Sequence, residues 1–367
     1  MAQLSIGIIG LPNVGKSTLF QALTALSVPA ENYPFCTIDP NVGVIEVPDA
    51  RLDRLHEMLP PREKVSPVVE FVDIAGLVAG ASRGEGLGNR FLHHVREADA
   101  LIQVVRAFED PTVVQPEGTS DPIEGLGIIE TELALADLEV VAKRRQTAER
   151  KARTGDKEEA ALTDLLERVE RRLDQGEPAR NESYSEQEES QLRSLALLTL
   201  KPMMFVLNVD EPDEFTEHPL EDQVRGWLAE RDPEALVLTE SARLEAEIAQ
   251  LPPEERAEFA LALGLEEPGL DRLIRASYRL LGLHTFFTIG ENEVRGWTVR
   301  VGAHAPEAAG KVHTDFERGF IRAETIHFED FVDVGSLKTA RERGLIRSEG
   351  KEYVVQDGDI LFFRTGT

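Results

Sequence analysis

The residues with the clearest chemistry form one short segment near the start of the chain, residues 10–17, which read GLPNVGKS. The segment fits G-x-x-x-x-G-K-[ST] without a gap, between an apolar run at residues 4–9 and a helical pattern at residues 18–26. In such a loop, backbone N–H groups converge on phosphates, the lysine reaches the outer phosphates and the hydroxyl ligates Mg²⁺. The segment therefore predicts a nucleotide-binding loop made of Asn13, Val14, Gly15, Lys16, Ser17 and Thr18.

A phosphate loop occurs in kinases, ABC-type ATPases and switch GTPases, so the class depends on the motifs that follow it. Asp73 ends an apolar run, where its carboxylate would hold Mg²⁺ through a water, and the nearby N–H of Gly76 would bind the γ-phosphate. Thr37 lies between the first helical pattern and the next strand-like run, where a switch loop offers its hydroxyl to the metal. These positions predict Ser17, Thr37 and Asp73 as Mg²⁺ ligands.

Two more motifs follow later strand-like runs and would contact the base. Asn208, Val209 and Glu211 come directly after the apolar run at residues 203–208, and the pair Ser241 and Ala242 follows the run at residues 235–239. Five motifs in this order, at the ends of these elements, predict a G-domain, which is an α/β P-loop NTPase fold.

The base-recognition motif departs from the Asn-Lys-x-Asp pattern that reads guanine. Val209 replaces the lysine, and the extra methylene of Glu211 moves the carboxylate by about one bond length, which a bidentate contact tolerates poorly. Against this, Asp210 is adjacent, and the N–H of Ala242 would ordinarily serve a guanine carbonyl. We expect ATP to be preferred over GTP, with GTP and GDP binding as the alternative.

The elements that must position these motifs change in style along the chain. Up to residue 130, short β-branched runs alternate with helical patterns, as in a parallel sheet covered by helices. Residues 131–200 carry an apolar stripe on solvated helices, which predicts an antiparallel, coiled-coil-like arm inserted in the α/β domain. Residues 201–282 return to the α/β pattern, and residues 283–367 indicate a compact α+β module with short strands and one helix at residues 310–318.

The composition excludes several other classes of protein. The 367 residues include 40 basic and 67 acidic side chains, and this net charge of -27 argues against nonspecific coating of nucleic acid or anionic membrane. A single cysteine, Cys36, excludes an intramolecular disulfide and suits a reducing compartment. We find no apolar run long enough to span a bilayer and no secretory leader, so we expect a cytoplasmic protein without a membrane partner.

Motifs that carry a family resemblance are spread over the whole chain. Besides the phosphate loop they are NYPFCTI at residues 32–38, GEGLGN at 84–89, RAFED at 106–110, Asn-x-x-Glu at 208–211 and AGKVHTDF at 309–316. Together they resemble the YchF/Obg-like ATPase family of translation-factor-type G-proteins. The resemblance implies a G-domain (residues 1–130 and 201–282), a helical coiled-coil insertion (131–200) and a C-terminal ubiquitin-like TGS domain (283–367). It also implies ATP hydrolysis and ribosome binding, through the arm and the TGS domain, at the large-subunit or intersubunit region and its rRNA.

Activation of the attacking water has two candidate routes. Leu77 replaces the glutamine that orients this water in many G-proteins, and leucine cannot do so. In the family a histidine after the Phe-Glu-Asp segment is associated with hydrolysis, and this chain carries Gln115 there, which is either a water-orienting amide or an exposed loop residue. Asn13 would ligate K⁺ beside the phosphates, as it does in G-proteins with a hydrophobic substitution, or would only cap the loop.

The sequence thus predicts a ribosome-associated, Mg²⁺-dependent ATPase whose nucleotide state controls binding to the ribosome. Lys16, Asn13, Gln115 and Gly76 are its candidate catalytic residues. A GTPase switch with a degenerate base motif and a scaffold that holds nucleotide without hydrolysis are the alternatives. The basic run at residues 143–157 either meets rRNA phosphates or is a solvated helix face balanced by Glu158 and Glu159.

Overall fold

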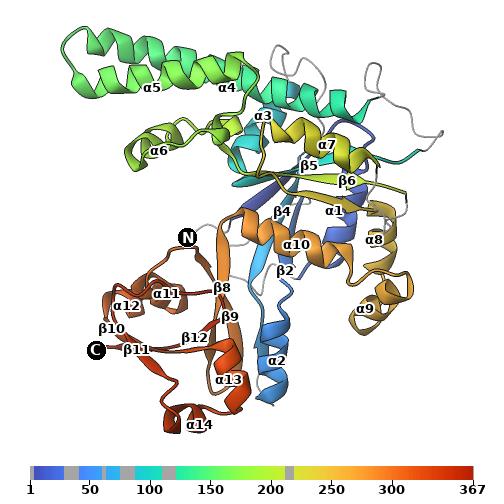
Figure 1. The fold of residues 1–367 in the computed structure, drawn as a ribbon, viewed down its shortest axis with the longest axis vertical. Coiled ribbons are helices and arrows are strands. Elements are labelled where there is room, and N and C mark those ends of the chain that lie inside the picture. Colours follow the sequence, from blue (N-terminus) through green and yellow to red (C-terminus); the bar gives the residue numbers. More distant parts are fainter. Residues whose placement is uncertain are drawn as a thin grey trace. The chain divides into compact units, whose positions relative to one another are not determined.

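The computed structural model describes residues 4–28, 41–59, 63–74, 87–109, 121–210 and 219–366 (Figure 1). The chain folds into two compact units, one made of residues 1–45 and 70–273 and the other of residues 46–69 and 274–367. The helical insertion belongs to the first unit.

The first unit is built on a six-stranded sheet in the order β2-β4-β1-β5-β6-β7. Its strands are β1 (Ser5–Ile9), β2 (Val42–Glu46), β4 (Val68–Asp73), β5 (Ala100–Arg106), β6 (Met203–Asn208) and β7 (Val237–Glu240). β1 pairs in parallel with β4 and β5, and β6 pairs in parallel with β5 and β7. The carboxyl ends of these parallel strands therefore lie along one edge of the sheet, which is where the predicted motifs begin.

Outside the inserted arm, the described residues of this unit form six α-helices. They are α1 (Lys16–Ala25), α3 (Leu87–Glu97), α7 (Pro219–Ala229), α8 (Ala242–Ile248), α9 (Pro253–Ala262) and α10 (Gly269–Leu280), whose C-terminal part enters the second unit. α1 packs against α8, so the helix that follows the phosphate loop contacts the helix that follows Ser241.

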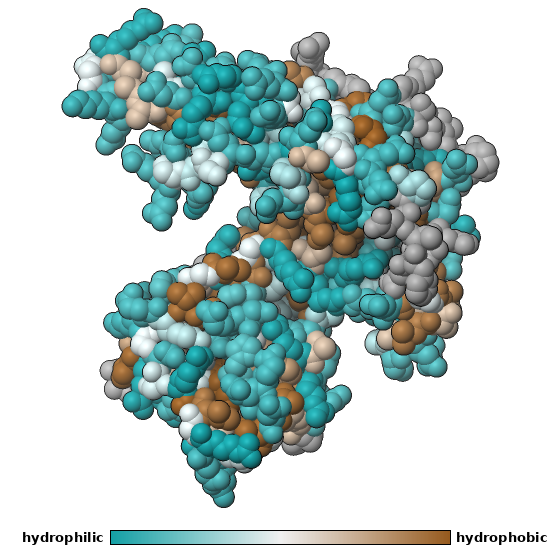
Figure 2. Space-filling view, viewed as in Figure 1, coloured by the Kyte–Doolittle hydropathy of each residue, from teal (hydrophilic) through white to brown (hydrophobic). Residues whose placement is uncertain are grey.

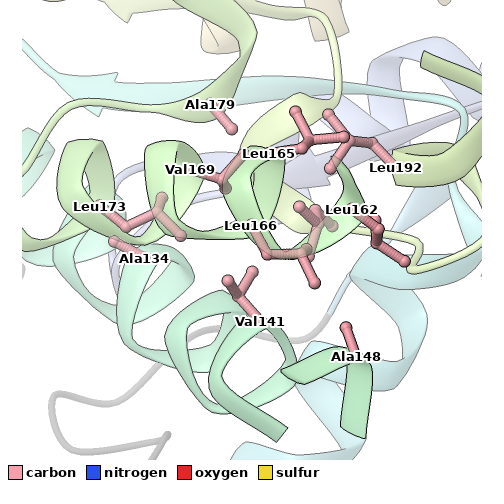
Figure 3. Close-up of a cluster of buried hydrophobic side chains, with 11 residues drawn as sticks. Ala134, Val141, Ala148, Leu162, Leu165, Leu166, Val169, Leu173, Ala179 and Leu192 are labelled. Atoms are coloured by element: carbon pink, nitrogen blue, oxygen red, sulfur yellow. The ribbon is translucent and has the colours of Figure 1, made fainter. Parts of the chain in front are cut away.

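The inserted arm is a helical hairpin of α4 (Pro122–Ala152) and α5 (Lys157–Asp174), followed by the short helix α6 (Glu186–Arg193). The predicted stripe on α5 is buried and packs against Val141 and Ala148 of α4 (Figure 3). Gly155, in the connecting turn, has a φ of 94°, which favours glycine. α4 runs without a break through residues 130 and 131, because its apolar positions face the sheet first and α5 afterwards.

The second unit contains another six-stranded sheet, in the order β11-β10-β12-β8-β9-β3. Its strands are β3 (Glu63–Val65), β8 (Leu283–Ile289), β9 (Glu293–Arg300), β10 (Phe320–His327), β11 (Arg347–Glu349) and β12 (Asp359–Thr365). Its helices are α2 (Ala50–Met58), α11 (Ala305–Val312), α12 (Thr314–Arg318), α13 (Phe328–Val334) and α14 (Leu337–Glu342). Most strand pairs are antiparallel, but β3 joins β9 and β12 joins β8 in parallel.

Two features of this unit differ from the sequence-based expectation. The single helix expected at residues 310–318 is two helices, because the backbone of His313 is extended and its side chain caps α12 through the N–H of Asp315. Residues 46–69, which the sequence placed with the G-domain, pack here: α2 buries Leu52 and Leu55 in a core with Phe287 and Val294.

Candidate nucleotide-binding site

The phosphate loop connects β1 to α1 in a conformation that its small residues allow. Gly15 has a φ of 93°, and a Cβ there would lie 2.0 Å from Nδ2 of Asn208, so no other residue fits without displacing that amide. A Cβ on Gly10 would lie 2.9 Å from the carbonyl oxygen of Val104. Gly15 caps α1 without a side chain, which leaves the helix N-terminus available for an anion.

Lys16 and Asp73 form an ion pair at the centre of this edge. The side chain of Lys16 is 9% exposed and that of Asp73 is 18% exposed, whereas Ser17, beside them, is exposed. The structure thus brings together a cation for phosphate and two oxygen ligands of the kind that Mg²⁺ prefers. Among the residues described, no group of three or more His, Cys, Asp or Glu side chains could hold a metal ion, so a cation here would need phosphate or water as further ligands.

Asn208 connects the three loops of the site. Its Nδ2 donates to the carbonyl oxygen of Val14 at 2.9 Å, and its Oδ1 accepts from the N–H of Ala242 at 2.9 Å. The side chain is buried, so both hydrogen bonds are shielded from water. The predicted site residue Asn208 therefore holds the phosphate loop against the Ser241–Ala242 loop.

The residues around Val209 are also fixed by hydrogen bonds. The N–H of Val209 donates to the carbonyl oxygen of Glu240 at 2.9 Å, and the hydroxyl of Ser241 donates to the carbonyl oxygen of Asp210 at 2.9 Å. The carboxylate of Asp210 accepts the N–H of Glu109 at 3.1 Å. This segment is therefore attached both to the RAFED segment and to the loop after β7.

A buried pair of acidic residues supports the last loop, and no local sequence pattern indicates it. Glu245 accepts the N–H groups of Gly269 and Leu270, each at 3.0 Å, and burial raises the pKa of its carboxyl despite these bonds. Glu240 accepts Nε of Arg272 at 3.0 Å. The Glu245 contact joins the start of α10 to α8, and the Glu240 contact joins α10 to the last residue of β7. In each contact the two partners are more than twenty residues apart in the chain.

A cavity of about 280 Å³ lies on the α4 side of the phosphate loop. It is lined by Leu11, Pro12 and Val14 of the loop, by the end of β5 with Phe108, and by the first turns of α4. Arg106 stacks over the ring of Phe108 at 4.3 Å, and Oε1 of Gln103 is buried without a hydrogen-bond partner. Polar and apolar side chains therefore both line this cavity, at the point where α4 meets the phosphate loop.

Four predicted site residues lie outside the described part of the chain: Thr37, Gly76, Gln115 and Glu211. The same holds for Cys36 and Leu77. The structure places the others, Asn13 to Thr18, Asp73, Asn208, Val209, Ser241 and Ala242, along one edge of the first sheet. Asn13 has a φ of 64°, a left-handed conformation that asparagine adopts more readily than most residues.

Comparisons with known proteins agree over almost the whole chain. Residues 5–123 match a family model described as "50S ribosome-binding GTPase", and residues 283–366 match the YchF-GTPase_C model, "Protein of unknown function (DUF933)". The chain is 50% identical over 357 residues to "Ribosome-binding ATPase YchF" of Escherichia coli O157:H7, covering 97% of this chain and 98% of that protein. The chain belongs to the YchF/Obg-like ATPase family.

More distant family members extend the agreement. "Obg-like ATPase 1" of Rattus norvegicus is 42% identical, over 99% of this chain and 93% of that protein. The solved structure of the Schizosaccharomyces pombe YchF GTPase has a TM-score of 0.87 and 38% identity, covering 99% of this chain and 98% of that one. Family membership and the two sheets confirm the predicted P-loop G-domain with a helical insertion and a C-terminal α+β domain.

None of the helices in the described part of the chain is both long and apolar enough to cross a membrane.

Proposed function

We propose that this chain is a Mg²⁺-dependent ATPase that binds the ribosome and couples the two through its nucleotide state. The observation that carries the proposal is the assembly of Lys16, Asp73 and Asn208 around one phosphate loop, at the carboxyl edge of a parallel sheet. The names of relatives that are 42–50% identical support it, because they describe ribosome-binding or Obg-like ATPases.

The donor set of the site fits Mg²⁺ bound together with a nucleotide. The Ser17 hydroxyl and the Asp73 carboxylate would hold the ion, with Thr37 as a further ligand, and Mg²⁺ when bound would neutralise charge that develops on the outer phosphates. Lys16 would exchange its ion pair with Asp73 for one with phosphate, which leaves the carboxylate for the metal. The N–H groups at the start of α1 would hold the inner phosphates.

Preference for adenine is supported by the hydrogen bonds of the base loops. A guanine carbonyl needs an N–H donor, but the N–H of Ala242 already donates to Asn208. Val209 offers no cationic stem over the base, and Asp210 already accepts from Glu109. GTP remains the second candidate substrate because the solved Schizosaccharomyces pombe relative is named a YchF GTPase.

The hydrolytic water would be activated through Asn13 with K⁺ or through Gln115. The left-handed backbone of Asn13 holds this residue in the phosphate loop itself, which supports the K⁺ route. Both assignments belong to the proposal, and the dependence of hydrolysis on K⁺ separates them.

Coupling to the ribosome is supported by the way α4 begins. A Cβ on Gly125 would lie 3.2 Å from Cδ1 of Leu11, so the first turns of the arm pack directly on the phosphate loop.

Arg144 and Lys151 pair with Glu159, which balances part of the basic run, whereas Arg150 and Arg153 near the tip have no ion pair within the described arm. We propose that these unpaired charges, with the C-terminal domain, contact rRNA.

Single-turnover hydrolysis with and without ribosomes tests the function, with Lys16→Ala as the comparison. Removal of the ammonium group should abolish hydrolysis of ATP and weaken nucleotide binding, because the outer phosphates lose their cation. Competition between ATP and GTP in the same preparation gives the base preference. Unchanged turnover in Lys16→Ala would refute the assignment of this site.

A further inference from the structure

The helix α9 presents large apolar side chains to solvent. Phe259 is 40% exposed, Leu261 is 62% exposed and Leu263, directly after the helix, is 49% exposed. In Figure 2 hydrophobic and hydrophilic residues lie side by side over α9. Exposed apolar residues are ordinary when they are scattered singly, but three within five positions at the end of one short helix form a patch that needs a reason.

The helix is held rigidly, so the exposure of these side chains is not a consequence of fraying. Pro253 starts α9, and the N–H groups of Gly264 and Leu265 close its last turn on the carbonyl oxygens of Leu261 and Ala260, both at 3.0 Å. Arg256 turns inward and donates to the carbonyl oxygens of Leu251 and Ala249. α9 is therefore a fixed surface element, and binding to it would cost little conformational entropy.

Acidic side chains occupy the centre of the exposed face. Successive residues of a helix are about 100° apart, so Glu255 and Glu258 point roughly away from the buried Ala260. Phe259 and Leu261 lie about a quarter turn to either side of Ala260. Glu254 is exposed as well, whereas Arg256, the basic residue of α9, uses its guanidinium on backbone carbonyls. The face is an acidic ridge with apolar flanks.

This pattern selects one kind of partner. RNA phosphates would be repelled by the glutamates, and a second copy of a chain with a net charge of -27 would bring the same acidic ridge. A basic polypeptide with apolar side chains between its cations complements both the charge and the apolar flanks. We propose that α9 is the docking surface for a basic protein of the ribosome, an inference that relies on the ribosome binding proposed above.

The test compares binding to intact ribosomes with binding to deproteinised ribosomal RNA, by co-sedimentation of the full chain. Phe259→Ser combined with Leu261→Ser should weaken binding to ribosomes at least tenfold and leave binding to the RNA unchanged. Glu258→Lys should also weaken ribosome binding, about two- to threefold, although the added positive charge favours RNA. Glu230→Lys, an equal charge change on an exposed position after α7, is the matched control and should not weaken it.

The outcomes separate this inference from the function on which it depends. All variants should keep the basal ATP hydrolysis and the melting temperature of the wild type, because α9 lies outside the nucleotide site. If the wild type does not bind ribosomes, the proposed function fails. If the wild type binds and the α9 variants bind equally well, or if they lose RNA binding to the same extent, the docking surface is refuted. A change of oligomeric state in the apolar variant would refute it in favour of self-association.

Discussion

Gly15 offers the sharpest test of how the nucleotide site is assembled. A methyl group at this position would meet Nδ2 of Asn208 at 2.0 Å and would force a residue other than glycine to a φ of 93°. The left-handed backbone costs about 1–2 kcal/mol, and loss of the two hydrogen bonds of Asn208 costs about 1 kcal/mol each, more if the N–H of Ala242 stays buried and unpaired. Gly15→Ala should therefore lower the free energy of unfolding of the first unit by about 3–5 kcal/mol.

Urea unfolding followed by circular dichroism measures the loss, and binding of a fluorescent ATP analogue reports the site. Gly127→Ala in α4 is the matched control, since nothing lies within 4 Å of its Cβ position, and this variant should gain about 0.5–1 kcal/mol. Asn208→Ala removes the obstacle, so the double variant Gly15→Ala with Asn208→Ala should lose less stability than the sum of the single changes. Additive losses, or wild-type behaviour of Gly15→Ala, would refute the contact between this loop and Asn208.

Three further outcomes follow from the same structure. Val209→Lys combined with Glu211→Asp rebuilds the pattern that binds guanine, so the ratio of GTP affinity to ATP affinity should rise about tenfold in competition binding. An unchanged ratio would show that other residues recognise the base. K⁺, but not Na⁺ at equal ionic strength, should accelerate single-turnover hydrolysis. Asn13→Ala should remove this acceleration while Mg²⁺-dependent nucleotide binding persists. A K⁺ effect that survives the substitution excludes Asn13 as the ligand. Hydrogen bonds from Arg364 hold the pKa of Glu324 below its ordinary value of about 4.5. Glu324→Gln should therefore lower the free energy of unfolding by up to about 1 kcal/mol at pH 7, and by progressively less as the pH falls below about 4.5. An equal loss at pH 7 and pH 3.5 would contradict the ion pair.

The sequence predicted the parts of the site that depend on local pattern. The phosphate loop is contiguous, and the strands that carry Asp73 and Asn208 are short apolar runs, so their order along the chain was enough to place them on one sheet. The hydrogen bonds of Asn208 could not be predicted in the same way, because Val14 and Ala242 lie far from it in the chain. Only the parallel pairing of β1 with β5, of β5 with β6 and of β6 with β7 brings the loops together.

The membership of residues 46–69 in the second unit escaped prediction for a related reason. β3 has three residues and no apolar run, and its parallel partner β9 begins more than two hundred residues later. α2 has an apolar face that would fit either domain, and only the core that receives Leu52 and Leu55 decides between them. Local periodicity reveals that such a helix exists but does not reveal the sheet that it covers.

The continuity of α4 has a mechanical consequence. With 31 residues at about 1.5 Å each, the helix is about 46 Å long, and its first turns rest on Leu11 of the phosphate loop. For a rigid helix of that length, a tilt of about 5° at the loop displaces the far end by about 4 Å. The buried seam between α4 and α5 stiffens the helix, so under the proposed function the arm would transmit a small rearrangement of the phosphate loop to a distance that no side chain could reach.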